Sequence, residues 1–134
     1  MREIKFRAKA GTQWRYGDLY HNECGELVIY EPKTSGRTLG GGAVDGWRIK
    51  VAPETVGQFT GMLDCEGREI YEGDIIKVRT QNPYWRFRRN YVVEWGTDGW
   101  LLDGDSLYSW FSLHTLEVIG NVHDNPDLLE VAHD

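Results

Sequence analysis

The residue types best suited to chemistry lie together in one segment, residues 84–91, where arginines are interspersed with aromatic residues. Guanidinium groups can pair with phosphates while aromatic rings stack on bases, and this combination holds single-stranded nucleic acids with little sequence preference. In the competing interpretation the rings belong to the core and the arginines coat the wet face of a hairpin. The candidate binding residues are Tyr84, Trp85, Arg86, Arg88, Arg89 and Tyr91.

The charge of the chain weighs against nucleic acid, because a domain that binds it normally carries a basic field over its whole surface. The formal net charge is −6. Residues 1–50 hold nine Lys and Arg against six Asp and Glu, whereas residues 91–134 hold nine acids and no Lys or Arg. Such an asymmetry steers association. The basic strip at residues 86–89, with the N-terminal part, could contact the acidic C-terminal third of another copy. That acidic third could instead imitate a phosphate backbone and occupy a nucleic-acid-binding protein of the host.

Metal and catalytic sites are not predicted, although residues of suitable type occur. Among the soft and imidazole ligands only one loose pair, His21-x-x-Cys24, has ligand-like spacing. The acidic residues lie near glycines without the regular spacing of a calcium loop, so solvated turns explain them better. The two groups are His21, Cys24, Cys65, His114 and His123, and Glu69, Glu72, Asp74, Asp98, Asp103 and Asp105. The chain has neither a Gly-x-Ser-x-Gly elbow nor a Gly-Lys-Ser/Thr phosphate loop. We therefore expect no catalytic residue and no cofactor.

The elements that must position these residues have a period of two, which is typical of strands with one buried face. Residues 1–30 alternate in this way and predict a small β-meander. Between residues 31 and 46 the composition shifts to Pro, Ser, Thr and Gly, which predicts a mobile loop. A turn from Asp64 to Gly67, with an acid first and glycine last, and a Gly73-Asp74 turn before a strand favour a small SH3-like barrel.

Two further patterns complete the predicted fold. Rings of one parity between residues 85 and 95 predict a long strand with a bulge near Arg89, and Asn125-Pro126 predicts the start of a short C-terminal helix. The fold class is therefore mainly β, with α+β character at the margins. A single domain over residues 1–134 contains an N-terminal meander (1–52), an SH3-like barrel (53–124) and a short helix with a tail (125–134).

Length and composition place the chain among globular domains, because 134 residues with 17 aromatic side chains can build one core. No stretch approaches the roughly 20 apolar residues of a membrane span, and the charged N-terminus lacks the apolar core of a secretory signal. We expect a cytoplasmic protein. Its two cysteines, Cys24 and Cys65, are expected to be reduced thiols.

Three segments resemble the YopX family of phage and prophage proteins: residues 4–8, 57–76 and 118–129. The second contains Gly-Gln-Phe-Thr-Gly-Met-Leu-Asp and Glu-Ile-Tyr-Glu-Gly-Asp-Ile, and the third contains Ile-Gly-Asn-Val-His-Asp-Asn-Pro-Asp-Leu-Leu. The resemblance covers nearly the whole chain. It implies a β-rich fold, a mobile genetic element as the source and a bacterial host cell as the location. It transfers no activity and no site residue, because the shared residues are those that a fold needs.

The sequence thus favours a phage-encoded accessory protein that acts by binding rather than by catalysis. Self-association into a homo-oligomer is the favoured contact, and a host or phage protein is the other protein partner. A nucleic-acid-binding module built on residues 84–91 is the alternative. A metal-dependent enzyme acting on nucleic acid is a more remote one.

Overall fold

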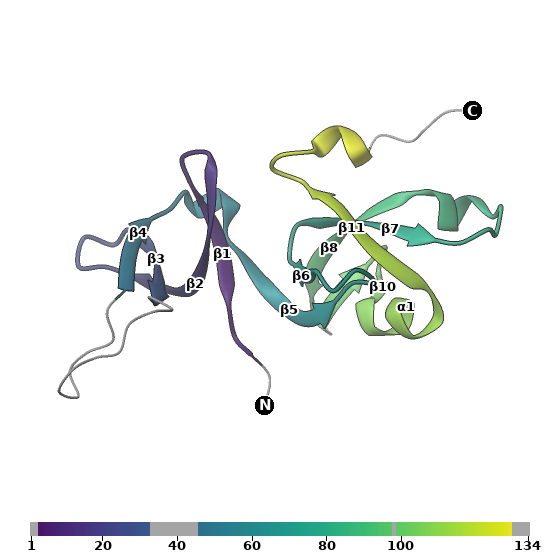
Figure 1. The fold of residues 1–134 in the computed structure, drawn as a ribbon, viewed down its shortest axis with the longest axis horizontal. Helices are drawn as coiled ribbons and strands as arrows, with labels where there is room; N and C mark the ends of the chain where they lie inside the picture. The colour runs from purple at the N-terminus through teal and green to yellow at the C-terminus, as the bar shows by residue number, and fades with distance from the viewer. Residues whose placement is uncertain (1–2, 33–45, 98, 130–134) are drawn as a thin grey trace. The chain divides into compact units, whose positions relative to one another are not determined.

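The structure, a computed structural model, describes residues 3–32, 46–97 and 99–129, except for the side chain of Trp85. Antiparallel strands in two sheets make up most of it (Figure 1), which confirms the mainly β class. The chain divides into two compact units, Met1–Phe59 and Thr60–Asp134. The single domain and the SH3-like barrel stay predictions. Among the described helices, none is long and apolar enough to cross a membrane.

The first unit contains the predicted β-meander, because consecutive strands pair antiparallel. Its strands are β1 (Phe6–Ala10), β2 (Gln13–His21), β3 (Leu27–Pro32) and β4 (Gly46–Lys50). The sheet order is β4-β3-β2-β1-β5-β6, so β4 lies at one end. The ends of the predicted mobile loop belong to strands instead, because Glu31 and Pro32 pair with Trp47 and Gly46. The rest of that predicted loop, residues 33–45, lies outside the described residues.

A helical turn after β4 returns the chain to β1. This turn is the 3₁₀ helix η1 (Pro53–Thr55), where Thr55 Oγ1 accepts the N–H of Lys9 at 2.8 Å and donates to the Ala52 carbonyl at 2.7 Å. Strand β5 (Gly57–Leu63) then starts beside β1, with Gln58 opposite Phe6. The buried core of this unit is small and comprises Ala8, Ile29 and Val51.

The second unit holds the other sheet and a larger core. Its strands are β6 (Glu69–Tyr71), β7 (Asp74–Arg79), β8 (Asn90–Gly96), β9 (Gly99–Leu102), β10 (Asp105–Ser106) and β11 (Thr115–Asn121). The order β10-β9-β8-β7-β11 is antiparallel throughout. The core cluster consists of Ile70, Ile76, Val78, Val93, Leu102, Leu107, Trp110 and Leu116.

The predicted Asp64–Gly67 turn is present and also fastens β11. Asp64 Oδ1 accepts the N–H groups of Glu66 and Arg68 at 2.9 and 2.8 Å. Its Oδ2 accepts the N–H of Val118 on β11 at 2.9 Å. Gly67 has a φ of 80°, the left-handed conformation that glycine adopts without strain. The turn acid is therefore a buried structural residue that joins two distant segments.

The Gly73-Asp74 turn is also observed. Gly73 has a φ of 89°, and the buried Asp74 accepts the N–H of Tyr71 through Oδ2 at 2.7 Å. Asp74 then opens β7, as the sequence predicts. The acids predicted here as turn residues include this one, whose carboxylate stabilises the bend directly.

The long strand predicted for residues 85–95 is wrong in its first half. Trp85–Arg88 form the 3₁₀ helix η2, and β8 begins only at Asn90. Asn82 favours the turn, because its Oδ1 accepts the N–H of Tyr84 at 2.9 Å, and the Tyr84 carbonyl accepts the N–H of Phe87 at 2.9 Å. Trp95, predicted to face inward, is 58% exposed. The alternation of rings and arginines therefore spans a helical turn and a shorter strand.

Two helical elements follow the sheet strands. The α-helix α1 (Leu107–Leu113) was not predicted, and it lies between β10 and β11. The predicted C-terminal helix is a 3₁₀ helix, η3 (Pro126–Leu129). Asn90 Nδ2 donates to the Leu128 carbonyl at 2.9 Å, which holds η3 against β8.

Candidate binding site

Arg86, the first arginine of the predicted strip, is engaged by two carboxylates of its own unit. Its Nε donates to Asp103 Oδ2 at 3.1 Å and its Nη2 donates to Asp105 Oδ2. These hydrogen bonds, from Asp105 first and Asp103 second, raise the pKa of Arg86 above its usual value. The guanidinium also lies 4.8 Å from the centroid of the Trp110 ring. The charge that the strip would offer to a phosphate is therefore compensated at this position.

Trp110 is the central residue of the site. It is 4% exposed, and its Nε1–H donates to the Leu102 carbonyl at 2.7 Å. Phe87 and His114 surround it, with ring centroids 6.1 and 5.4 Å from that of Trp110. Tyr91 lies 5.8 Å away on the sheet side. The indole is thus fixed by a hydrogen bond and by rings from η2, β8 and the end of α1.

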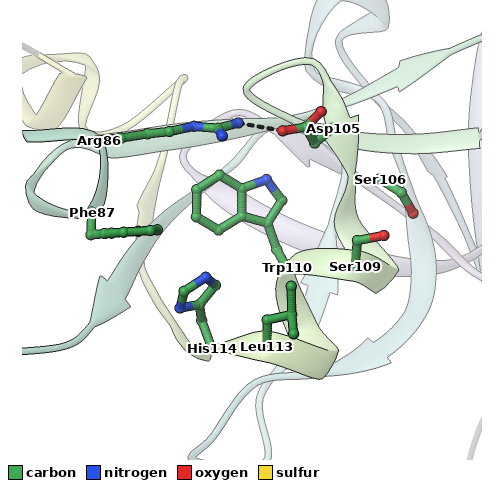
Figure 2. Close-up of a pocket in the computed structure, with 8 residues that line it drawn as sticks. All are labelled: Arg86, Phe87, Asp105, Ser106, Ser109, Trp110, Leu113 and His114. Carbon is green, nitrogen blue, oxygen red and sulfur yellow. Dashed lines mark hydrogen bonds and ion pairs between the residues drawn. The ribbon is translucent and has the colours of Figure 1, made fainter. Parts of the chain in front are cut away.

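A cleft of about 360 Å³ opens over this aromatic cluster. Figure 2 shows Trp110 at its centre, with Arg86 and Asp105 on one side and His114 and Leu113 on the other. Its lining residues are Arg86, Phe87, Asp105, Ser106, Ser109, Trp110, Leu113 and His114. The floor is aromatic, and the rim carries a guanidinium, a carboxylate and two hydroxyl groups. Such a site can take up an aromatic or apolar group and orient a polar neighbour.

The helix that forms one wall of the cleft is uncharged and partly apolar on its exposed side. Leu107 and Trp110 are buried and anchor α1 to the core. Tyr108, Phe111 and Leu113 are 72%, 42% and 75% exposed. Large apolar side chains exposed side by side on one element mark interaction sites more often than chance allows.

The six predicted binding residues are distributed over the wall and the outside of this site. Arg86 lines the cleft, and Tyr91 supports it from below by donating from its hydroxyl to the Arg86 carbonyl at 2.9 Å. Burial, followed by the charge of Asp103, raises the pKa of Tyr91. Tyr84 is 52% exposed, and Arg88 and Arg89 are exposed as well. Nothing is described of the side chain of Trp85, so its predicted role stays a prediction.

Sequence reasoning missed the helical half of the site. Ser106, Ser109, Trp110, Leu113 and His114 come from α1 and its ends. The available signal was a charge-free run from Leu107 to Thr115 in which Leu107, Trp110 and His114 recur at helical spacing. That run follows short strands closely and is only two turns long, which hides its period.

The other residues of suitable chemistry have structural or exposed positions. Cys24 and Cys65 are free thiols and exposed. Arg79 Nη1 lies 3.7 Å from Cys65 Sγ. Asp98 lies outside the described residues. Within the described ranges, no group of three or more His, Cys, Asp and Glu side chains converges as metal ligands would.

These features define the class of the protein: an antiparallel β protein of two units with an aromatic cleft on the second. The chain belongs to the YopX family, because the family model described as YopX protein matches residues 5–130. The resemblance of the three sequence segments is thereby confirmed.

Two solved structures are similar to this chain at low sequence identity. Protein EF1440 from Enterococcus faecalis has a TM-score of 0.59 at 21% identity, covering 97% of this chain and 100% of its own. Protein yopX from Bacillus subtilis has a TM-score of 0.56 at 21% identity, covering 99% of this chain and 100% of its own. At this identity they share the fold alone. No curated protein matches the chain.

Proposed function

We propose that this protein acts by binding protein rather than by catalysis, and that a second copy of the chain is the partner. The binding surface is the cleft over Trp110 together with the exposed side of α1. In this proposal the protein is a phage-encoded accessory protein of the bacterial cytoplasm. The family resemblance and the bacterial origin of the two similar structures support that setting.

The observation that carries the proposal is the exposure of α1. A seven-residue helix without a charged side chain exposes Leu113 to 75% and Tyr108 to 72%. The centre of a protein interface is depleted of charge and enriched in aromatic residues. The aromatic cleft continues this surface, and its fixed indole supplies a rigid floor, which lowers the ordering cost of binding.

The alternative partner, nucleic acid, has less support from the geometry. Arg86 donates to two carboxylates, and Asp105 lines the cleft beside it. A carboxylate at this position repels phosphates, whereas it attracts a cationic side chain of a protein. Arg88 and Arg89 remain exposed, so the nucleic-acid proposal is restricted to these two arginines.

Sedimentation velocity over a wide concentration range tests the proposal. We expect reversible self-association that Leu113→Lys weakens about thirtyfold or more, as for a residue central to an interface. Leu63→Lys is the matched control, because Leu63 is 47% exposed in the same unit and does not line the cleft. A monomer at every concentration, or equal weakening by both variants, would overturn the proposal.

A further inference from the structure

The proposed self-association leaves open which part of the second copy enters the cleft. Resting on that proposed function, we propose that the occupant is Trp47 of strand β4, with Arg48 facing Asp105 at the rim. The contact is then head-to-tail, because each copy uses β4 on one side and the α1 cleft on the other.

Trp47 has the exposure and position that such an occupant needs. Its side chain is 58% exposed, and it lies on β4, opposite Glu31 of β3. The sheet order places β4 at one end, where a strand can approach another molecule. Tryptophan is the residue most enriched among those that dominate interface energies. A large ring that is kept in water on an end strand is therefore a plausible anchor.

The charges beside Trp47 complement those of the cleft. Arg48 and Lys50 follow it on β4, and both are exposed. Lys50 is already ion-paired with Glu26, whereas the Arg48 guanidinium lies 5.5 Å from the Tyr30 ring centroid. We therefore assign Arg48 to the carboxylate at the cleft rim.

Trp95 shows why the charge decides the choice. It is exposed to the same extent as Trp47, 58%, but its neighbour in the chain is Glu94. Entry of Trp95 would bring a second carboxylate close to Asp105, and like charges repel at such distances. Equal rings with opposite neighbours thus favour β4 over β8.

The size and chemistry of the cleft suit one indole. A volume of about 360 Å³ lies at the lower end of the range for ligand sites, roughly 300 to 1,000 Å³. The incoming ring can pack against Trp110 and Leu113, and the hydroxyl groups of Ser106 and Ser109 can accept its Nε1–H. The occupant's hydrogen-bond donor would therefore not be buried without a partner.

A head-to-tail contact has a distinctive mixing behaviour, which provides the test. Trp47→Ala lacks the ring but keeps its cleft, and Leu113→Lys lacks the cleft but keeps its ring. Each variant alone should be monomeric in sedimentation velocity, and an equimolar mixture should form a one-to-one complex. Trp95→Ala is the matched control and should associate as the wild-type protein does.

Two further measurements separate a folding defect from a lost contact. Arg48→Glu keeps Trp47, and it should weaken association at least about tenfold at low salt and by less at high salt. Circular dichroism and urea unfolding check that each variant is folded. If Leu113→Lys is monomeric while Trp47→Ala associates normally, the assignment of Trp47 is overturned and the proposed function stands. If the wild-type protein is a monomer throughout, the proposed function itself fails.

Discussion

The same kind of hairpin loop occurs once in each unit, at residues 22–26 and at residues 64–68. In each, the Oδ1 atom of the first residue, Asn22 or Asp64, accepts two backbone N–H groups of the loop. Gly25 and Gly67 occupy equivalent positions, with φ values of 79° and 80°. An Asx residue followed three positions later by glycine is thus sufficient to form this loop in two different surroundings.

The two loops differ in what the first side chain does beyond the loop. The amide of Asn22 donates to Glu26 within the same loop at 3.1 Å. The second oxygen of Asp64 accepts the N–H of Val118, 54 residues away, and the side chain is fully buried. The loop of the second unit is therefore part of its tertiary structure, whereas the loop of the first unit is a local connection.

The cores of the two units differ in the same direction. The described residues contribute three buried side chains to the core of the first unit and eight to that of the second. Leu107 and Trp110 of the second core hold α1 in place. Binding residues on a rigid scaffold keep their geometry, which is why we place the binding site on this unit.

The largest expected effect on stability is that of Asp64→Ala. It leaves three backbone N–H groups without their acceptor, one of them on β11, and should cost about 3 kcal/mol of unfolding free energy. Asn22→Ala should cost only about 1 kcal/mol, as for the loss of a local cap. Urea unfolding followed by NMR signals of each unit measures both values. Equal losses would show that the two loops are energetically alike.

A smaller effect is the pH dependence that Asp64 imposes. Burial alone would raise the pKa of Asp64, but the N–H groups of Val118, Arg68 and Glu66 and the charge of Arg68 outweigh it, so the pKa is lowered. This contribution to stability is complete above the unfolded-state pKa of about 3.9 and is lost as the pH falls through the lower folded-state value.

Asp64→Asn is the variant that isolates this pH dependence. Its deficit relative to the wild-type protein should be largest near neutral pH and should narrow below about pH 4, because protonation removes the same charge from the wild-type protein. Urea midpoints measured between pH 2 and 7 give the two curves. A deficit that stays constant over this range would exclude an ionised Asp64 as the source of the stabilisation.

The glycines should give equal and intermediate effects. A Cβ added to Gly25 or Gly67 meets nothing within 4 Å, so alanine adds only backbone strain at positive φ. Each substitution should cost about 1 kcal/mol. The same unfolding experiment measures it. A much larger cost at Gly67 would mean that the second loop resists strain because it is fastened to β11.

How far the sequence predicts the structure depends on whether a feature is local. The turns at Asp64 and Gly73 and the strands of the meander follow from side chains and glycines within a few residues. The helical turn at Trp85–Arg88 was predicted as strand, because its alternating rings and arginines fit a period of two. Its hydrogen bonds involve Asn82 and Tyr91, whose effect the periodicity does not contain.

The cleft could not be predicted because it joins segments that lie apart in the sequence. Arg86 comes from η2, whereas Asp105 and the residues of α1 follow about twenty positions later. The arginines predicted as a phosphate-binding strip are divided by the fold, with Arg86 compensated by acids and Arg88 and Arg89 left exposed. Charge counting identified the acidic C-terminal third, but only the tertiary structure pairs two of its acids with Arg86.

The smallest expected effect on stability belongs to the residue that matters most for binding. Leu113 is 75% exposed, so Leu113→Lys should change the unfolding free energy by no more than about 0.5 kcal/mol. Urea unfolding at a concentration where the protein is monomeric provides the value. A large loss would mean that Leu113 supports the fold, and its effect on association would then need no interface.

Hydrogen exchange at two protein concentrations tests most directly whether the α1 cleft is a binding surface. Mass spectrometry of the wild-type protein, dilute and concentrated, should show slower exchange in the concentrated sample for peptides that cover residues 103–114. Peptides from β2, far from the proposed contact residues in the sequence, should be unchanged. Exchange in residues 103–114 that does not depend on concentration would contradict the proposed role of the cleft, and so would protection confined to other segments.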